Sequence, residues 1–99
     1  MSYRVWIDPS AIAELKGTPG HVRQRLKRAM LALGTDPRPP DSKPLEWPPE
    51  HFEPRRLKLR NWRIVYVVDD DVSWVWVLAV RKRPPYDYGD IAALFRQLS

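Results

Sequence analysis

A proline-rich segment in the middle of the chain places the strongest restriction on the fold. Seven of the eleven prolines lie between Thr35 and Pro54. Proline has no backbone N–H and a fixed φ, so this segment forms neither a helix nor a central strand. Two structured regions are therefore expected, one on each side of a long connection that is either functional or a wrapped surface loop. Trp47 and Phe52 are expected to pin that connection to the core.

The region before the prolines predicts one strand and two helices. Aromatic and β-branched residues alternate over 3–7, as in a strand. Asp8 and Pro9 predict an N-cap and a proline at the first helical position. Thr18-Pro19 repeats this start signal for a second helix over 21–33, and Gly34 is a natural stop. The apolar residues of the second helix form one stripe: Val22, Leu26, Ala29, Met30 and Leu33.

The region after the prolines predicts a small sheet. Leucine and cations alternate over 56–60, and Asn61 supplies a turn residue. Residues 62–68 are apolar on both faces, which is typical of a central strand. The three aspartates at 69–71 predict a hairpin turn in preference to a cation site, with 72–80 as the partner strand.

The last part of the chain predicts another helix. Ile91, Leu94, Phe95 and Leu98 have helical spacing, and Asp87 is a candidate cap. The expected order is β-α-α-β-β-β-α. We therefore expect one α+β domain over residues 1–99, with a mostly antiparallel sheet, an N-terminal α-hairpin packed on it and a C-terminal helix.

Composition excludes several classes of protein. The chain has no cysteine, so disulfide scaffolds, thiolate catalysis and cysteine-ligated metals are excluded. No apolar run approaches the roughly 20 residues that span a membrane, and the first residues lack the pattern of a signal peptide. These features fit the cytoplasm. The formal charge of +5 favours an anionic partner, with nucleic acid the leading candidate.

Much of this positive charge lies where the last three strands are expected to meet. Alternate residues Arg56, Lys58 and Arg60 lie about 6.5 Å apart on one strand face, a spacing close to that of phosphates in an extended nucleic-acid strand. Arg63 interrupts an otherwise apolar strand, where a cation either meets an anion or remains costly. A further basic cluster follows the last strand: Arg81, Lys82 and Arg83. The alternative interpretation is a solvated strand face that discourages edge pairing.

Other residues carry weaker indications. Tyr86 and Tyr88 follow the basic cluster and suit stacking on an RNA base, although either also suits packing under the last helix. Arg23 and Lys27 belong to a basic helix face that suits contact with RNA. His51 is a lone loop histidine, more often incidental than catalytic. No glycine-rich phosphate loop and no metal-binding motif is present.

Several segments together resemble the RelE/ParE superfamily of type II toxin–antitoxin toxins. The resemblance covers nearly the whole chain, and its most specific part is Trp62-Arg63-Ile64-Val65-Tyr66 followed by an acidic turn. The other segments that carry it are DPRPPDSKPL at 36–45, RRLKLRNWRIVYVVDDD at 55–71 and VLAVRKRPPYDY at 77–88. The chain differs from many members in having Asn61 for a glycine and Arg81-Lys82 where glycine and histidine are common.

The resemblance implies a ribosome-dependent endoribonuclease that cleaves mRNA in the A site by attack of the 2′-hydroxyl on the adjacent phosphate, with no metal or other cofactor. By position, Arg56 and Lys58 match the strand cations, with Lys58 the general base. Arg63 matches the contact to the scissile phosphate. Arg83 matches a leaving-group acid or charge stabiliser, and the second role is favoured because arginine rarely loses its proton. Tyr88, or in its place Tyr86, matches the tyrosine that stacks on the base.

Two alternatives remain open. One is a ParE-like toxin that poisons DNA gyrase by binding, without catalysis, because one scaffold serves both activities. The other is a basic nucleic-acid-binding module or an inactive toxin relic. The resemblance also implies an antitoxin encoded nearby. Part of the surface formed by Trp6, Trp74 and Trp76 is a candidate to receive it, although core packing explains these residues more simply.

Overall fold

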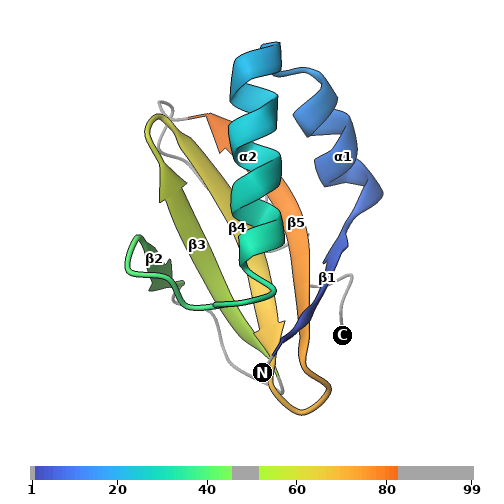
Figure 1. Ribbon diagram of the computed structural model, residues 1–99, viewed down its shortest axis with the longest axis vertical. Helices are drawn as coiled ribbons and strands as arrows, with labels where there is room; N and C mark the ends of the chain where they lie inside the picture. The colour runs from blue at the N-terminus through green and yellow to red at the C-terminus, as the bar shows by residue number, and fades with distance from the viewer. Residues whose placement is uncertain (1, 46–51, 83–99) are drawn as a thin grey trace.

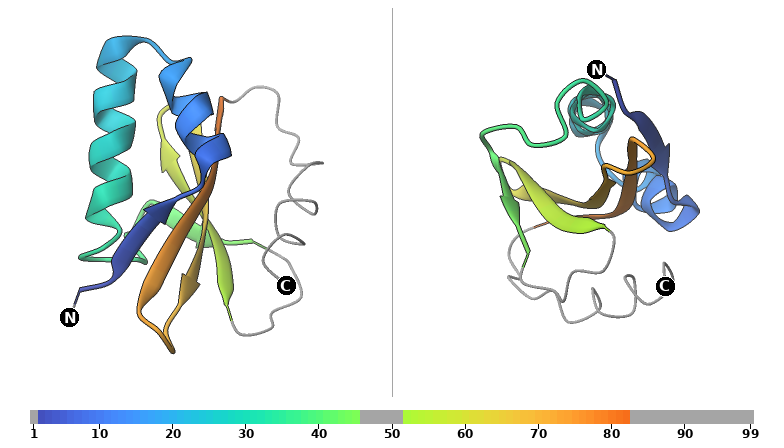
Figure 2. Two further views of the ribbon diagram at one scale, coloured as in Figure 1. Left: turned by 90° about the vertical axis from the view of Figure 1, so that its right-hand side faces the viewer. Right: turned by 90° about the horizontal axis from the view of Figure 1, so that it is seen from below.

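The protein is built on one mixed sheet that carries both helices on the same face (Figures 1 and 2). A computed structural model describes residues 2–45 and 52–82. Within them the sheet has five strands in the order β1-β5-β4-β3-β2, and β1 is the one strand that pairs parallel to its neighbour. In chain order the elements are β1 (Arg4–Ile7), α1 (Pro9–Lys16), α2 (Gly20–Ala32), β2 (Ser42–Pro44), β3 (Glu53–Leu59), β4 (Trp62–Asp69) and β5 (Trp74–Lys82). The predicted C-terminal helix lies outside the described residues.

The start of α1 follows the sequence signal, and the start of α2 does not. The Ser10 backbone N–H donates to the Asp8 carboxylate at 2.9 Å, and Pro9 occupies the first turn. Thr18 does not cap α2, because its hydroxyl donates to the Leu15 carbonyl at 2.7 Å and so closes the end of α1. The residue that precedes α2 is Pro19, which offers no side-chain cap.

Position 34, just after the end of α2, requires a glycine because β1 passes very close to it. Its φ is not positive, so the left-handed conformation is not what requires glycine here. A Cβ at this position would lie 2.9 Å from the Tyr3 carbonyl oxygen and 3.2 Å from a Val5 methyl carbon. The Tyr3 N–H donates to the Gly34 carbonyl at 2.7 Å, so this contact fixes β1 against the end of the helix.

The prediction that 62–68 forms a central strand is confirmed. β4 is the middle strand of the sheet, and its residues from Ile64 to Asp69 are buried. Ile64, Tyr66 and Val68 face the helices, where Leu26 and Met30 of α2 complete the core. Val65 and Val67 face the other way and form a second cluster with Phe52, Leu78 and Ala79. Phe52 therefore pins the proline-rich segment as expected, while Trp47 lies outside the described residues.

The proline-rich segment contributes an edge strand that the sequence did not predict. β2 pairs antiparallel with β3, with Ser42 opposite Leu57. β3 also begins at Glu53, before the expected start at Arg56, and it includes Pro54. The Pro54 carbonyl accepts from the Leu45 N–H at 2.9 Å. Because the N and O of an antiparallel residue point to the same side, the missing N–H of Pro54 faces Leu45 and the β2 side of the strand and costs no bond with β4.

The two turns of the C-terminal meander differ from the predicted boundaries. Arg60 is not in the strand: it has φ 55° and forms the β3–β4 turn with Asn61. The acidic turn is longer than expected, and β5 begins at Trp74 where the sequence predicted Val72. The Asp71 N–H donates to the Asp69 carboxylate at 3.0 Å, and Ser73 has φ 57°. The Asp69 carboxylate therefore serves the turn itself.

A β-bulge interrupts the β4–β5 ladder. Val65 lies opposite Ala79 and Tyr66 lies opposite Val77, so Leu78 is the extra residue. As a result Leu78 and Ala79 both lie in the cluster that faces away from the helices. Parallel pairing of β5 with β1 ends at the same place, with Ile7 opposite Val77.

Candidate functional site

Three cations form a row across the last three strands. Lys58 of β3 lies opposite Arg63 of β4, and Arg63 lies opposite Arg81 of β5. Strand alternation places this cation row on the face away from the helices, since Ile64 and Val80 beside it belong to the helix-facing core. Arg56 lies two residues from Lys58 on the same side of β3. The meander thus brings together cations that are separated in the sequence, as predicted.

Arg63 is the most constrained member of the cation row. Its side chain is half-buried, and one terminal nitrogen donates to the Arg60 carbonyl at 2.8 Å and to the Trp62 carbonyl at 2.9 Å. Its Nε is buried and has no hydrogen-bond partner among the residues that the structure describes. No carboxylate among residues 2–45 and 52–82 pairs with it. Its charge is therefore held in place by backbone carbonyls and is not neutralised by any of these residues.

Arg81 is held from the helix layer by a residue that sequence reasoning missed. Glu14 of α1 forms an ion pair with the Arg81 guanidinium and accepts from the Val80 N–H at 3.2 Å. β5 extends past the end of β1 at this point, so Glu14 fills the place of a missing strand. Glu14 is the one carboxylate inside α1, but nothing in the sequence connects it to a strand sixty-odd residues away.

The remaining strand cations differ in their surroundings. The side chain of Lys58 is exposed and that of Arg56 is half-exposed, and within the described part of the chain neither forms an ion pair. Arg60 is exposed in the turn, and Lys82 is exposed at the end of β5 opposite Trp62. Arg83, Tyr86 and Tyr88 lie outside the described residues.

Two other arginines are committed to the fold, in a group that we call the polar clamp. Arg38 pairs with Glu53 at 3.1 Å and with Asp70 at 2.8 Å. Arg55 pairs with Glu53 at 2.8 Å, and its side chain is only 11% exposed. The Tyr3 hydroxyl donates to Asp70 at 2.6 Å. The polar clamp thereby ties the proline-rich segment and β3 to the β4–β5 turn and the N-terminus.

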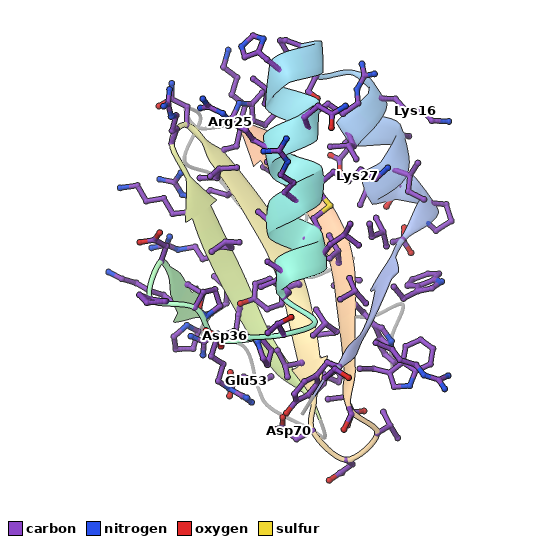
Figure 3. All side chains as sticks on the ribbon, viewed as in Figure 1. Lys16, Arg25, Lys27, Asp36, Glu53 and Asp70 are labelled. Atoms are coloured by element: carbon purple, nitrogen blue, oxygen red, sulfur yellow. The ribbon has the colours of Figure 1, made fainter. Side chains whose placement is uncertain are left out.

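The contacts of the polar clamp shift the pKa values of its members. Hydrogen bonds from Tyr3 and then Arg38 lower the pKa of Asp70. Burial alone would raise the pKa of Glu53, but hydrogen bonds from Arg55 and Arg38 outweigh it, so the pKa is lowered. The bond to Asp70 raises the pKa of Tyr3 and that of Arg38. Figure 3 shows Glu53, Asp70 and Asp36 together at the end of the sheet remote from Arg25.

The two predicted RNA-binding residues of α2 lie in the helix layer, on the opposite side of the sheet from the cation row. The Arg23 guanidinium donates to the Lys16 and Thr18 carbonyls at 3.1 Å each, so it also closes the end of α1. Lys27 is exposed on α2 (Figure 3). The structure therefore separates the predicted RNA contacts into two surfaces.

Residues 2–45 and 52–82 contain no group of three histidine, aspartate or glutamate side chains placed to hold a metal ion. His21 is exposed at the start of α2, and His51 lies outside the described residues. None of the described helices is both long enough and apolar enough to cross a bilayer.

Comparison with known proteins gives a consistent result for structure. No protein-family profile and no curated protein matches the sequence. A free double mutant of the E. coli toxin RelE is 26% identical, with complete coverage of both chains and a TM-score of 0.76. A chain of the E. coli RelBE toxin–antitoxin complex is 30% identical, with 83% of this chain and 98% of that chain covered and a TM-score of 0.66.

A third structure agrees in fold. The archaeal RelE–RelB complex from Pyrococcus horikoshii OT3 gives a TM-score of 0.75 at 24% identity, covering 85% of this chain and 98% of that one. The mixed sheet with two helices on one face is thus the fold of RelE-type toxins. The chain belongs to the RelE/ParE superfamily as a RelE-like toxin.

Proposed function

We propose that the protein is a ribosome-dependent endoribonuclease that cleaves mRNA in the A site. The observation that carries this proposal is the cation row, in which Arg63 is half-buried, has no hydrogen-bond partner at Nε within the described part of the chain and lies directly opposite two further cations. Like charges opposite each other weaken a sheet, and an unsatisfied buried donor costs free energy. Such an arrangement is expected where an anion completes it, and the scissile phosphate is that anion.

The proposed reaction needs charge stabilisation more than it needs a metal. The ribose 2′-oxygen forms a bond to the adjacent phosphorus while the bond to the 5′-oxygen breaks, leaving a 2′,3′-cyclic phosphate and a 5′-hydroxyl. Negative charge gathers on the non-bridging oxygens in the transition state. Preorganised cations stabilise that state more than the ground state.

The chain's own residues fit these roles. Arg63, fixed by the Arg60 and Trp62 carbonyls, contacts a non-bridging oxygen of the phosphate. Lys58 accepts the proton of the 2′-hydroxyl, and Arg56 adds charge on the same face of β3. Arg81 takes a positioning role because Glu14 already neutralises part of its charge. Arg83 stabilises the charge on the leaving 5′-oxygen, which takes its proton from water, and Tyr88 or Tyr86 stacks on the base.

A cognate antitoxin is the proposed protein partner. RelE-like neighbours occur in complexes with RelB antitoxins, including those from P. horikoshii, E. coli and Mycobacterium tuberculosis. Trp6 of β1 is 43% exposed, and the Arg4 guanidinium lies 5.8 Å from the Trp74 ring centre. This aromatic surface is a candidate part of the antitoxin contact. The ribosome and its mRNA are the proposed targets, and the cytoplasm is the proposed location.

The test uses purified ribosomes carrying an mRNA, with cleavage mapped by primer extension. Lys58→Ala and Arg63→Ala should each reduce the cleavage rate by about a hundredfold or more. Lys16→Ala removes an exposed lysine from α1 and serves as the control, with cleavage unchanged. Full cleavage by both site variants would refute the assignment of the site.

The second candidate function is that of a ParE-like gyrase poison. Its only support is that one scaffold serves both activities. Induction in cells separates the two activities. Cuts within translated codons support the nuclease. DNA breaks and an SOS response with intact transcripts would instead support gyrase inhibition.

A further inference from the structure

A cleft lies between the first half of α2 and the tip of the β3–β4 hairpin, on the opposite side of the sheet from the cation row. Its volume is about 190 Å³. His21 and Arg25 line it from α2, and Arg60, Asn61 and Trp62 line it from the hairpin. Figure 3 shows Arg25 on the side of α2 that is turned toward this tip. No role in the proposed reaction uses this cleft.

The charge of the cleft selects an anion. Arg25 and Arg60 are both exposed, and within residues 2–45 and 52–82 neither forms an ion pair. His21 adds a third nitrogen donor, and the described residues that line the cleft include no acidic one. Glu53 and Asp70 of the polar clamp lie at the far end of the sheet (Figure 3). The charged groups that a ligand meets among these lining residues are therefore cationic.

The walls of the cleft select a flat, partly apolar group beside that anion. The half-buried Trp62 presents an aromatic ring, and Val22 and Leu59 supply aliphatic surface. Asn61 adds an amide with both a donor and an acceptor. An aromatic wall next to guanidinium groups is the arrangement that binds a nucleotide, with the base stacked on the ring and the phosphate on the cations.

The backbone of Arg60 gives independent support. Its φ of 55° is left-handed, a conformation that is strained for most non-glycine residues and that glycine or asparagine adopts more readily. The next residue is Asn61, which would adopt this conformation more readily, yet the strained position itself carries an arginine. Because Arg63 donates to the Arg60 carbonyl at 2.8 Å, the turn is also fixed directly to the cation row.

We propose that this cleft binds one nucleotide of single-stranded RNA, next to the nucleotides held on the cation row. The Arg60-Asn61 turn is the common edge of both surfaces, so a strand leaving the row passes around it into the cleft. This inference rests on the proposed function, since it takes RNA as the substrate. It assigns Arg25, Arg60 and Trp62 to RNA binding outside the reacting groups.

The test measures binding of a short fluorescent single-stranded RNA to the isolated full chain, without ribosomes. Arg25→Ala and Arg60→Gly should each weaken binding several-fold and lower the slope of log Kd against log salt by about 0.7. Arg60→Gly removes the charge and relieves the left-handed strain, so its fold is preserved. Arg28→Ala removes an exposed cation from the same helix outside the cleft and is the matched control, expected to change Kd less than twofold.

A second probe tests the aromatic wall. The same RNA with one abasic nucleotide should bind the native chain about fivefold more weakly, and in NMR spectra the Trp62 indole and Asn61 amide signals should shift only with the intact RNA. The proposal is overturned if the three arginine variants lose affinity equally, if none does, or if the abasic RNA binds as well as the intact RNA. Competition by an acidic polypeptide at equal charge concentration would also overturn it, in favour of a protein ligand.

These outcomes are separable from those of the cleavage test. If the native protein does not cleave mRNA on ribosomes but still binds RNA in a way that depends on Arg25, the nuclease proposal is refuted and the cleft proposal stands. If the native protein cleaves mRNA normally but its RNA binding does not depend on Arg25 or Arg60, the cleft proposal is refuted and the nuclease proposal stands.

Discussion

Lys58 and Arg63 lie directly opposite each other on β3 and β4. Opposed residues on an antiparallel pair have Cβ atoms about 5 Å apart, a position in which opposite charges stabilise a sheet and like charges weaken it. The fold of this protein thus contains a local conflict at the place where the proposed reaction requires positive charge. Proteins commonly accept lower stability at such sites.

The first prediction follows from this conflict. Arg63→Leu removes both the charge repulsion and the unpartnered Nε, while it gives up two bonds to backbone carbonyls that water can replace. We expect the free energy of unfolding to stay the same or rise by up to about 1 kcal/mol, although cleavage is lost. Urea denaturation measures the effect. A loss of more than 1 kcal/mol would show that Arg63 has mainly a structural role.

Tyr66 provides the second prediction. Its hydroxyl is buried and donates to the Pro37 carbonyl at 2.8 Å, which ties the proline-rich segment to the central strand. Tyr66→Phe leaves that buried carbonyl without its donor and should lower stability by about 1–2 kcal/mol. Tyr3→Phe removes an exposed hydroxyl bonded to Asp70 and should cost less than about 0.5 kcal/mol. Equal losses in thermal denaturation would contradict this explanation.

The third prediction compares two glycines near the ends of α2. Gly34→Ala places a Cβ 2.9 Å from the Tyr3 carbonyl oxygen, so β1 must shift, at a cost of about 1–3 kcal/mol. Gly20→Ala meets no atom within 4 Å and should stabilise the helix by about 0.5–1 kcal/mol. The two variants should therefore move the melting temperature in opposite directions. A shift in the same direction would show that the close approach of β1 does not limit this position.

The fourth prediction concerns pH. The pKa values of Glu53 and Asp70 are lowered in the folded protein. A carboxyl with a lowered folded pKa binds fewer protons in the native state than in the unfolded state, so its contribution to stability is complete above its unfolded pKa and decreases as the pH falls below about 4.5. The double variant Glu53→Gln with Asp70→Asn should be less stable at neutral pH and should lose less further stability on acidification. Parallel stability–pH curves for the two proteins would refute this role for the polar clamp.

Local sequence signals were sufficient for part of the fold. The stripe of α2, the cap of α1 and the apolar run of β4 each specify an element through nearest neighbours along the chain. The convergence of Lys58, Arg63 and Arg81 could also be predicted, since short turns force three successive strands to pair antiparallel. These features depend only on the order of the elements and on the spacing of residues along the chain.

The rest depends on contacts between distant residues. The parallel pairing of β1 with β5, the ion pair of Glu14 with Arg81 and the edge pairing of β2 all join segments far apart in the chain. Arg60 was expected in the strand because the alternation of cations continues through it. Its left-handed φ could not be predicted, because the signal for a turn stood at Asn61. The cleft between α2 and the β3–β4 hairpin depends on that turn, so the sequence does not predict the cleft either.

The bulge at Leu78 divides the sheet into halves that differ in mechanical support. Before it, β5 is hydrogen-bonded to β1 and β4. Beyond it β1 has ended, the pairing with β4 resumes in a shifted register, and among the described residues the Glu14 side chain accepts from the Val80 N–H where β1 no longer pairs. Local opening of such a region requires less free energy than global unfolding. The tip that carries Lys58, Arg63 and Arg81 is therefore expected to show faster amide hydrogen exchange than the first half of β5. A tip that opens more easily than the rest of the sheet would allow the charged groups to adjust to the proposed ribosomal target without disturbing the hydrophobic core.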